Sequence, residues 1–327
     1  MNERRIIVKT PASTANLGPG FDTLGMALSL YTWIDMAATD GPTRIELLGG
    51  RLKGIPTDKS NLIYKMAQLV YDEAGYTLPE LEIAMYSEIP LTRGLGSSAT
   101  AIVGALTAAN VLAGRPLSDQ RLLELATAEE GHPDNVGASL LGGIVVAAAG
   151  AAGSVDCIRL EPHARLEVLV AIPDFQLATE KARHALPDSL PLADAVHNVG
   201  RSSLLTAALA IGRLDLIGKA MQDRIHQPFR APLIPGMADI LARAAAHGAL
   251  GAALSGAGPT LLTLVDAHST RKQELERFLL DTLESAGVRA ELRWLQPVRL
   301  GPEVELLDRS MQDVPLMDWI KGEVKHD

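Results

Sequence analysis

The feature of this sequence that most constrains its fold is the segment Pro90–Thr100, PLTRGLGSSAT, which runs directly into an apolar stretch of helical composition. Its two glycines let the backbone turn tightly and come close to a ligand. The first N–H groups of the following helix have no partner within that helix, so they favour an anion. The segment has neither the Gly-Lys-Ser/Thr triplet of a Walker loop nor a G-x-G-x-x-G pattern. Alone, such a turn is more often structural than functional, but its N–H groups and serine hydroxyls suit a polyphosphate.

The composition limits the class of protein. A chain of 327 residues is long enough for two domains, and 47% hydrophobic with 21% charged residues is typical of a folded protein. The net charge of −9 argues against nucleic-acid binding, although not against a nucleotide. Because no apolar run approaches the roughly 20 residues of a membrane span, we expect no membrane partner. The single cysteine excludes an intrachain disulfide and fits a cytoplasmic protein.

Periodicity predicts helices and strands in both halves of the chain. In the first half, helical spacing covers Ser60–Ala74, the stretch after the glycine-rich segment to Ala113, and Ser118–Glu130. The β-prone segments there are Arg5–Lys9, Tyr31–Ala37, Arg44–Leu48, Leu81–Ser87 and Ile144–Ala148. An Ala/Gly/Ser-rich stretch at 149–155 predicts a linker.

The second half has the element order of a ferredoxin-like domain. A strand at Leu166–Ile172 precedes several helices between 193 and 247, followed by two apolar runs around Gly256. A helix at Thr270–Ala286 and a strand at Val288–Trp294 complete a β-helices-β-β-α-β order. We therefore expect an α+β protein with domains at 1–155 and 156–307 and a peripheral tail at 308–327.

Two more segments are rich in glycine and proline. Pro11–Gly25 contains Asn16 and Asp22, which are its only polar groups suited to a charged small molecule. Leu254–Thr260 is a tight reversal between two apolar runs. In isolation, each segment is best interpreted as a turn.

Taken together in this order, the three segments resemble the signature motifs of the GHMP small-molecule kinases. The stretch NLGPGFDTLG, which ends at Gly25, is similar to that of the homoserine kinases within this superfamily. Agreement continues at Glu130–Asn135, Thr179–Arg183 and Gln227–Arg230, so that the resemblance runs from about residue 6 to about residue 300. It implies a two-domain GHMP kinase fold of the α+β class. The N-terminal domain would resemble ribosomal protein S5 domain 2, and the C-terminal domain would be ferredoxin-like.

The resemblance implies ATP and Mg²⁺ as cofactors. Asn61 would contact the adenine edge, and Ser98 and Glu130 would hold the cation through oxygen atoms. Glu129 stays open as the alternative ligand, because some family members carry extra residues in this block. The loop expected to wrap the ATP phosphates comprises Pro90, Leu91, Thr92, Arg93, Gly94, Leu95, Gly96, Ser97, Ser98, Ala99 and Thr100.

The acceptor implied by the resemblance is the amino acid L-homoserine. Asp22 would pair with its ammonium group, and Asn16 would hydrogen-bond nearby polar atoms. Arg183 and Arg230 would clamp its carboxylate, because a guanidinium makes bidentate, charge-assisted hydrogen bonds. Thr179 shares a helix face with Arg183. The residues expected to act on the transferred group are His132, Asn135, Ser98 and Arg183, with Asp134 having a structural role.

The reaction implied is transfer of the ATP γ-phosphoryl group to the homoserine hydroxyl, a step of threonine biosynthesis. Positioning and charge stabilisation supply most of the catalysis in such transfers, so a strong base is not required. Two alternatives remain: a GHMP kinase acting on threonine or mevalonate, and a non-catalytic sensor with the same fold. Two arginines with Asp22 favour a zwitterionic ligand. Family members are often dimers, so the resemblance also allows a homodimer.

Overall fold

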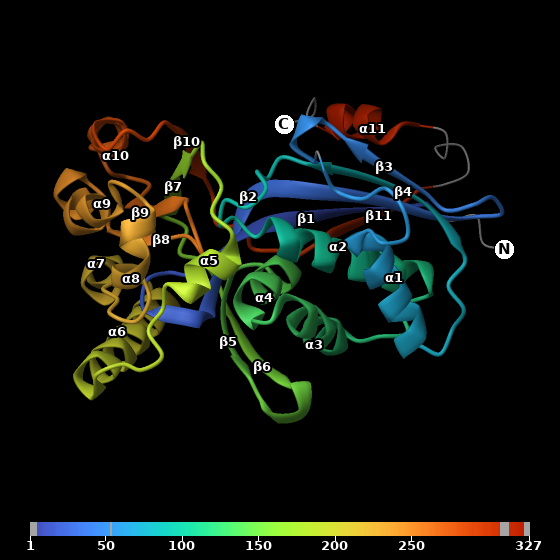
Figure 1. The fold of residues 1–327 in the computed structure, drawn as a ribbon, viewed down its shortest axis with the longest axis horizontal. Helices are drawn as coiled ribbons and strands as arrows, with labels where there is room; N and C mark the ends of the chain where they lie inside the picture. Colours follow the sequence, from blue (N-terminus) through green and yellow to red (C-terminus); the bar gives the residue numbers. More distant parts are fainter. Residues whose placement is uncertain (1–4, 53, 308–313, 324–327) are drawn as a thin grey trace.

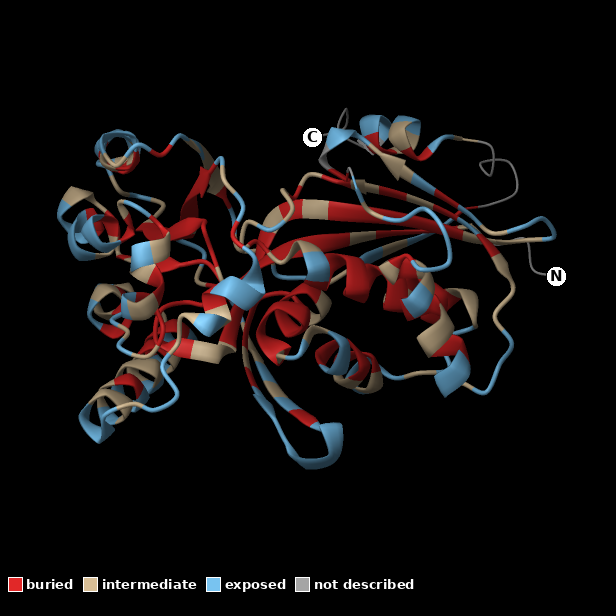
Figure 2. Ribbon diagram, viewed as in Figure 1, coloured by how far each residue is buried: buried red, intermediate tan, exposed pale blue. Residues whose placement is uncertain are grey.

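The structure is a computed structural model that describes residues 5–52, 54–307 and 314–323. Two lobes lie side by side, each built around one β-sheet (Figure 1). Buried residues concentrate on the strands and on the helix faces that cover them (Figure 2). Within the described residues, every helix is too short or too polar to span a bilayer.

The first lobe contains a seven-stranded sheet in which β11, β1, β2, β4 and β3 are neighbours in that order, while β5 pairs with both β2 and β6. All of these pairs are antiparallel except β3 with β4. The strands are β1 (Arg5–Asn16), β2 (Gly20–Thr39), β3 (Arg44–Leu48), β4 (Glu80–Ser87), β5 (Ile144–Ala149), β6 (Val155–Leu160) and β11 (Glu303–Leu307).

Four helices cover one face of this sheet and a fifth lies on the other (Figure 1). α2 is buried almost all round, and its small residues let it approach the strands closely: a Cβ on Gly104 would lie 2.9 Å from Thr10 Oγ1. On the opposite face, Leu316 and Ile320 of α11 pack against Ile7 and Trp33. The helices are α1 (Leu62–Glu73), α2 (Ser97–Leu112), α3 (Asp119–Glu130), α4 (Pro133–Leu141) and α11 (Leu316–Glu323).

The second lobe contains a four-stranded antiparallel sheet in the order β10-β7-β9-β8. Along the chain, helices lie between β7 and β8 and between β9 and β10. Together with the spatial order of the strands, this is the ferredoxin-like arrangement predicted from the sequence. The strands are β7 (Leu166–Pro173), β8 (Gly251–Leu254), β9 (Leu261–Asp266) and β10 (Ala290–Leu295). The α-helices are α5 (Thr179–His184), α6 (Leu192–Ile211), α7 (Ile217–Ala220), α8 (Gln227–Arg230), α9 (Met237–Arg243) and α10 (Lys272–Ser285). Short 3-10 helices, including those of the first lobe, lie at Gly50–Leu52, Ala151–Gly153, Leu214–Leu216, Ala231–Leu233 and Ala244–His247.

The first two strands are longer than the sequence pattern predicts. The segment interpreted as a turn, Pro11–Gly25, instead forms the end of β1 and the start of β2, joined by a tight turn at residues 17–19. Every residue from Ala12 to Asn16 is buried, so the strand lacks the inside–outside alternation by which a half-exposed strand is recognised. Register shifts at two positions disturb the pattern further.

Two strands beyond residue 155, β6 and β11, also belong to the first sheet. The chain therefore returns to the first lobe after completing the second. The domain limits at residues 155 and 307 stay a prediction. Of the tail predicted as peripheral, residues 308–313 and 324–327 lie outside the described residues, and α11 packs on the outer face of the first sheet.

Candidate active site

A cavity of about 490 Å³ lies between the lobes and is lined by residues of all three glycine-rich segments. Most of the predicted site residues meet there: Asn16, Asp22, Asn61, Leu91, Thr92, Arg93, Gly94, Gly96, Ser97, Ser98, Glu130, His132, Asn135, Thr179, Arg183 and Arg230. Four members of the predicted phosphate loop do not line it, namely Pro90, Leu95, Ala99 and Thr100. The side chains of Leu95 and Ala99 are instead part of the hydrophobic cores.

The three segments are joined by hydrogen bonds. Ser255 Oγ donates to the carbonyl of Gly94 at 2.5 Å and lies 2.8 Å from the hydroxyl of Thr14. The carbonyl of Gly256 accepts a hydrogen bond from the Asn16 amide at 3.0 Å. The segment at Leu254–Thr260 therefore links the other two glycine-rich segments.

Both glycines of the segment Pro90–Thr100 are required because neighbouring residues leave no room for a side chain. Gly94 and Gly96 have φ of +78° and +69°, a region that residues with a side chain rarely adopt. A Cβ on Gly94 would lie 2.2 Å from the Ser255 carbonyl, and one on Gly96 would lie 2.1 Å from Ser13 Oγ. The loop therefore approaches its neighbours more closely than any other residue type allows.

Gly96 caps α2, and the open N–H groups of the first turn follow it. The N–H of Thr100 donates to the Gly96 carbonyl at 2.9 Å, which leaves the N–H groups of residues 97–99 outside the helix's own hydrogen bonds. The Thr100 hydroxyl bonds to the Ser97 carbonyl and contacts Thr32. The anion-binding capacity of this turn therefore comes from the residues before Thr100.

We expect Gly96→Ala to destabilise the protein by about 2–4 kcal/mol and to abolish ATP binding, because strain and a steric clash add at the phosphate loop. Urea unfolding and titration with ATP measure the two effects. Gly75→Ala is the matched control: its φ is +71°, but a Cβ there meets nothing within 4 Å. Equal losses in both variants would show that the close approach at Gly96 has no role.

Glu130 lies at the end of α3, next to the start of α2. Its carboxylate accepts a hydrogen bond from Ser98, and burial raises the pKa of Glu130. Within the described part of the chain, no lysine or arginine forms an ion pair with it. Glu129 is exposed and does not line the cavity. The geometry thus brings together Ser98 and Glu130 and leaves Glu129 outside.

A second polar cluster lies at the start of α4. His132 Nδ1 is 2.5 Å from Asp134 Oδ1, which also accepts the Asn135 N–H at 2.7 Å. Burial favours the neutral ring, but the hydrogen bond and charge of Asp134 outweigh it and raise the pKa of His132. Asn135 Oδ1 accepts from Ser13 at 3.0 Å. Ligand atoms of Asp22, His132 and Asp134 lie within 4.8 Å of one another, so this cluster is a second candidate cation site.

Asp22 and Arg183 form a bidentate ion pair across the cavity, with both N···O distances 3.1 Å. The family resemblance implies that these residues bind opposite ends of one ligand. Each is about one-third exposed, so the pair can open to solvent or ligand. The two residues satisfy one another's charge.

Arg230 is buried, with 2% of its surface exposed, yet it lines the cavity. It donates to the carbonyls of Ala182 and Gly256, both at 3.1 Å, and to His226 Nδ1 at 3.3 Å. Among the described residues, no carboxylate forms an ion pair with it, and burial lowers the pKa of Arg230 to about 10. A buried guanidinium without a counter-ion favours an anionic ligand.

Two side chains that are predicted to contact ligands, those of Asn61 and Asn16, form hydrogen bonds within the protein. The Asn61 side chain caps α1 through the Ile63 N–H at 2.8 Å and donates to the Pro56 carbonyl at 2.5 Å. Asn16 Oδ1 accepts the Asp22 N–H at 3.0 Å. Asn61 lies at the apolar end of the cavity, whose wall includes Ile55, Pro56, Leu62, Ile63 and Met85. Thr179 is exposed and lines the same cavity.

Comparison with known proteins agrees with this geometry. Family models for the GHMP kinases N terminal domain and GHMP kinases C terminal domain match residues 61–143 and 205–284. A homoserine kinase from Deinococcus radiodurans is 48% identical over 285 residues, covering 87% of this chain and 92% of that protein. The chain belongs to the homoserine kinase family of GHMP kinases. The predicted family is therefore confirmed.

Other family members match over similar lengths. A homoserine kinase from Desulfitobacterium hafniense is 44% identical over 284 residues, covering 87% of this chain and 94% of that protein. The crystal structure of homoserine kinase from Cytophaga hutchinsonii is 29% identical and superposes with a TM-score of 0.84, covering 93% of this chain and 98% of that one. Membership confirms the predicted α+β two-domain GHMP kinase fold and the use of ATP.

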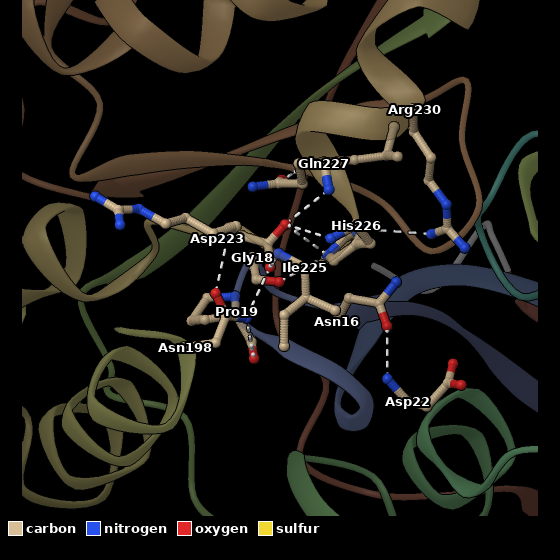
Figure 3. Close-up of polar contacts among 12 residues, drawn as sticks. Asn16, Gly18, Pro19, Asp22, Asn198, Asp223, Ile225, His226, Gln227 and Arg230 are labelled. Atoms are coloured by element: carbon tan, nitrogen blue, oxygen red, sulfur yellow. Dashed lines mark hydrogen bonds and ion pairs between the residues drawn. The ribbon is translucent and has the colours of Figure 1, made fainter. Parts of the chain in front are cut away.

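One buried group that the sequence pattern does not predict is formed by Asp223 and His226 with Asn198 (Figure 3). Asp223 lies four residues before α8 and accepts the N–H groups of Ile225, His226 and Gln227 at 2.7–3.0 Å. An aspartate just before a helix is a recognisable capping signal. The contacts that His226 makes across the lobes have no such signal.

Proposed function

We propose that this chain transfers the γ-phosphoryl group of ATP to the side-chain hydroxyl of L-homoserine, giving O-phospho-L-homoserine and ADP in threonine biosynthesis. The observation that carries the proposal is the charge arrangement at the open helix turn. An acidic group, Asp22, and two guanidiniums, Arg183 and Arg230, line the same cavity as the start of α2. An α-amino acid offers an ammonium and a carboxylate to match them.

Ligand binding would exchange the partners of the Asp22–Arg183 ion pair. The ammonium group would replace Arg183 beside Asp22, and the carboxylate would replace Asp22 between Arg183 and Arg230. Because charges are exchanged rather than left unpaired, the desolvation cost of opening the pair is offset. Mevalonate has no ammonium group and would leave Asp22 without a partner. This favours an amino acid over mevalonate, and threonine remains the alternative acceptor.

The phosphates of ATP would lie against the N–H groups of residues 97–99, with the base at the apolar end near Asn61. The Glu130 carboxylate would face those phosphates and repel them without a cation between. Ser98 and Glu130 offer the oxygen ligands that Mg²⁺ prefers. Mg²⁺ would supply positive charge to the phosphoryl oxygens. We therefore propose Ser98 and Glu130 as its protein ligands, with the cluster of Asp22, His132 and Asp134 as the alternative.

In the transfer itself, the hydroxyl oxygen forms a bond to the γ-phosphorus while the bond from that phosphorus to ADP breaks, and the hydroxyl proton passes to a phosphoryl oxygen or to water. His132 and Asn135 line the cavity and would orient the hydroxyl. A loose transition state needs little prior deprotonation of the nucleophile, so positioning carries the reaction. The helix turn and Arg183 would stabilise the charge on the transferred group.

ATP consumption measured side by side with L-homoserine, L-threonine and mevalonate tests the proposal. We expect the highest kcat/KM with homoserine. If turnover is fastest with threonine or mevalonate, that compound is the acceptor and the proposal of homoserine is wrong. Absence of turnover with all three, together with tight ligand binding, would instead indicate a sensor.

We expect Asp134→Asn to lower kcat about 10-fold with little change in either KM, because Asp134 orients His132 and Asn135 without acting as the base. Steady-state kinetics with homoserine and ATP measure this. A loss of several orders of magnitude in kcat, with unchanged substrate binding, would make Asp134 the base.

The expectations of a homodimer and of a cytoplasmic location rest on the family resemblance and the composition. Analytical ultracentrifugation of the full chain tests the first. A sedimentation coefficient of a monomer at micromolar concentration would contradict it.

A further inference from the structure

His226 lies fully buried between the turn that carries the first motif and the arginine that lines the cavity (Figure 3). Its Nε2 is 2.8 Å from the carbonyl of Gly18, and its Nδ1 is 3.3 Å from an Arg230 Nη1. A carbonyl can only accept, so Nε2 must carry the proton. A guanidinium can only donate, so Nδ1 must be free of one. The two contacts together fix a neutral ring in a single tautomer.

A stacking contact and a backbone hydrogen bond also hold the ring in place. Phe21 stacks on it with centroids 5.1 Å apart, and the same Phe21 ring lies beneath the guanidiniums of Arg183 and Arg230. Asp223 fixes the backbone of His226 by accepting its N–H at 3.0 Å. The ring therefore has little freedom to turn away from Arg230.

Charges around the ring also support the neutral form. Burial lowers the pKa of His226, and the positive charge of Arg230 lowers it further. The Asp223 carboxylate, 3.6 Å from Nε2, and Asp22 act in the opposite direction. A protonated ring would place an N–H against the N–H of Arg230. Such a like-charged contact in the buried site would be unfavourable.

The turn at residues 17–19, beyond the ring, joins the two strands that carry the cavity-lining residues Asn16 and Asp22. Gly18 lies between Asn16 and Asp22, and a Cβ on it would be 2.3 Å from the Met221 carbonyl. Asn198, which also bonds Asp223, reaches the neighbouring Pro19 carbonyl at 3.4 Å. His226 thus connects the turn of Asp22 to Arg230 through one rigid ring.

We propose that His226 is a positioning residue for the acceptor: its neutral ring bonds Gly18 and Arg230 together, and so fixes the guanidinium relative to Asp22. This inference rests on the proposed function, since it assigns the two ends of the acceptor to these residues. Its consequence is specific. Loss of the Nδ1 contact weakens acceptor binding and leaves ATP binding unchanged.

Two substitutions separate the two contacts. In His226→Gln, the amide nitrogen can still donate to Gly18, but the acceptor toward Arg230 is lost. In His226→Asn, the carbonyl lies near the former Nδ1 and keeps that acceptor, while the donor to Gly18 is lost. His268→Gln changes an exposed histidine of the same lobe and serves as the matched control.

We expect His226→Gln to raise KM for homoserine about 10-fold, as loss of a hydrogen bond to a charged group does, with KM for ATP within about 2-fold of the original. We expect His226→Asn to raise the homoserine KM by only about 3-fold. Steady-state kinetics and thermal melting of all three variants give the readout.

An equal rise of both KM values, or a larger effect of His226→Asn than of His226→Gln, would overturn the proposal. Failure of both variants to fold would also overturn it, because the ring would then be a structural element of the core. The proposed function fails separately, in the unchanged protein, if that protein does not phosphorylate homoserine. If threonine is the better acceptor, the same KM comparison is made with threonine.

Discussion

Replacing Arg230 by methionine is expected to lower kcat/KM for homoserine about 1000-fold. Methionine fills a similar apolar volume but removes a buried positive charge that lines the cavity. Loss of a charge-assisted contact to a carboxylate in a desolvated site costs several kcal/mol, and about 1.4 kcal/mol corresponds to each factor of ten. Steady-state kinetics with each substrate varied in turn measure the effect. We expect the KM and kcat/KM for homoserine to change and the KM for ATP to stay the same.

Arg230→Lys is the matched control for charge. Lysine keeps the positive charge but lacks the planar fork that reaches Ala182, Gly256 and a carboxylate together. We expect it to retain about ten times more activity than the methionine variant. A large rise in KM for ATP, with homoserine binding unchanged, would contradict the assignment of Arg230 to the acceptor.

The second large effect is expected for Glu130→Gln, which should lower kcat about 1000-fold and raise the Mg²⁺ concentration needed for half-maximal activity. The amide is nearly the same size, so the change removes charge rather than shape. Glu129→Gln alters the neighbouring exposed glutamate and should leave activity within about 2-fold. If Glu129→Gln had the larger effect, the alignment of this block would be shifted by one residue, and the cation site with it.

The pH dependence of the same site follows from the burial of Glu130. Because burial raises the pKa of Glu130, its carboxylate takes up a proton at a higher pH than an exposed glutamate does. A bound cation requires the ionised form, so Mg²⁺ binding should weaken as pH falls through this raised pKa. Titration of Mg²⁺-dependent activity from neutral toward acidic pH measures it. A Mg²⁺ requirement that does not change over this range would contradict the role of Glu130.

The sequence predicts much of the fold because most elements have a periodic pattern. The structure confirms the helices predicted at Ser60–Ala74 and Thr270–Ala286 to within a few residues. It also confirms the order of helices and strands in the second lobe. The ends of β1 and β2 were missed, because a run of small residues buried on both faces has no alternation. β11 and α11 were missed as partners of the first sheet, because their contacts join the two ends of the chain.

The candidate site was predicted as a set of residues rather than as an arrangement. Motif positions bring Asp22, Arg183 and Arg230 to one cavity, but they give no indication that Asp22 and Arg183 pair with each other. His226 was missed for a related reason. Its partner Gly18 lies 208 residues away in the sequence, and no local pattern connects them. The sequence thus indicates which chemical groups are present, whereas the contacts between them are known only from the structure.

The fold by itself does not select the acceptor. The same architecture can serve different acceptors, because specificity lies in the residues of the site and not in the fold. The combination of Asp22 with two cavity-lining arginines is what favours an amino-acid acceptor. A direct measurement of the product therefore tests the proposed acceptor.

The most direct test is the ³¹P spectrum of the product formed from ATP and L-homoserine by the unchanged protein. A phosphate ester on the homoserine hydroxyl has the atoms P–O–CH₂, so its proton-coupled signal should be a triplet that grows as ADP forms. Competition between homoserine and threonine in one tube is also resolved, because phosphothreonine gives a doublet. We expect the triplet in excess. A doublet in excess, or only inorganic phosphate beside ADP, would contradict homoserine as the acceptor.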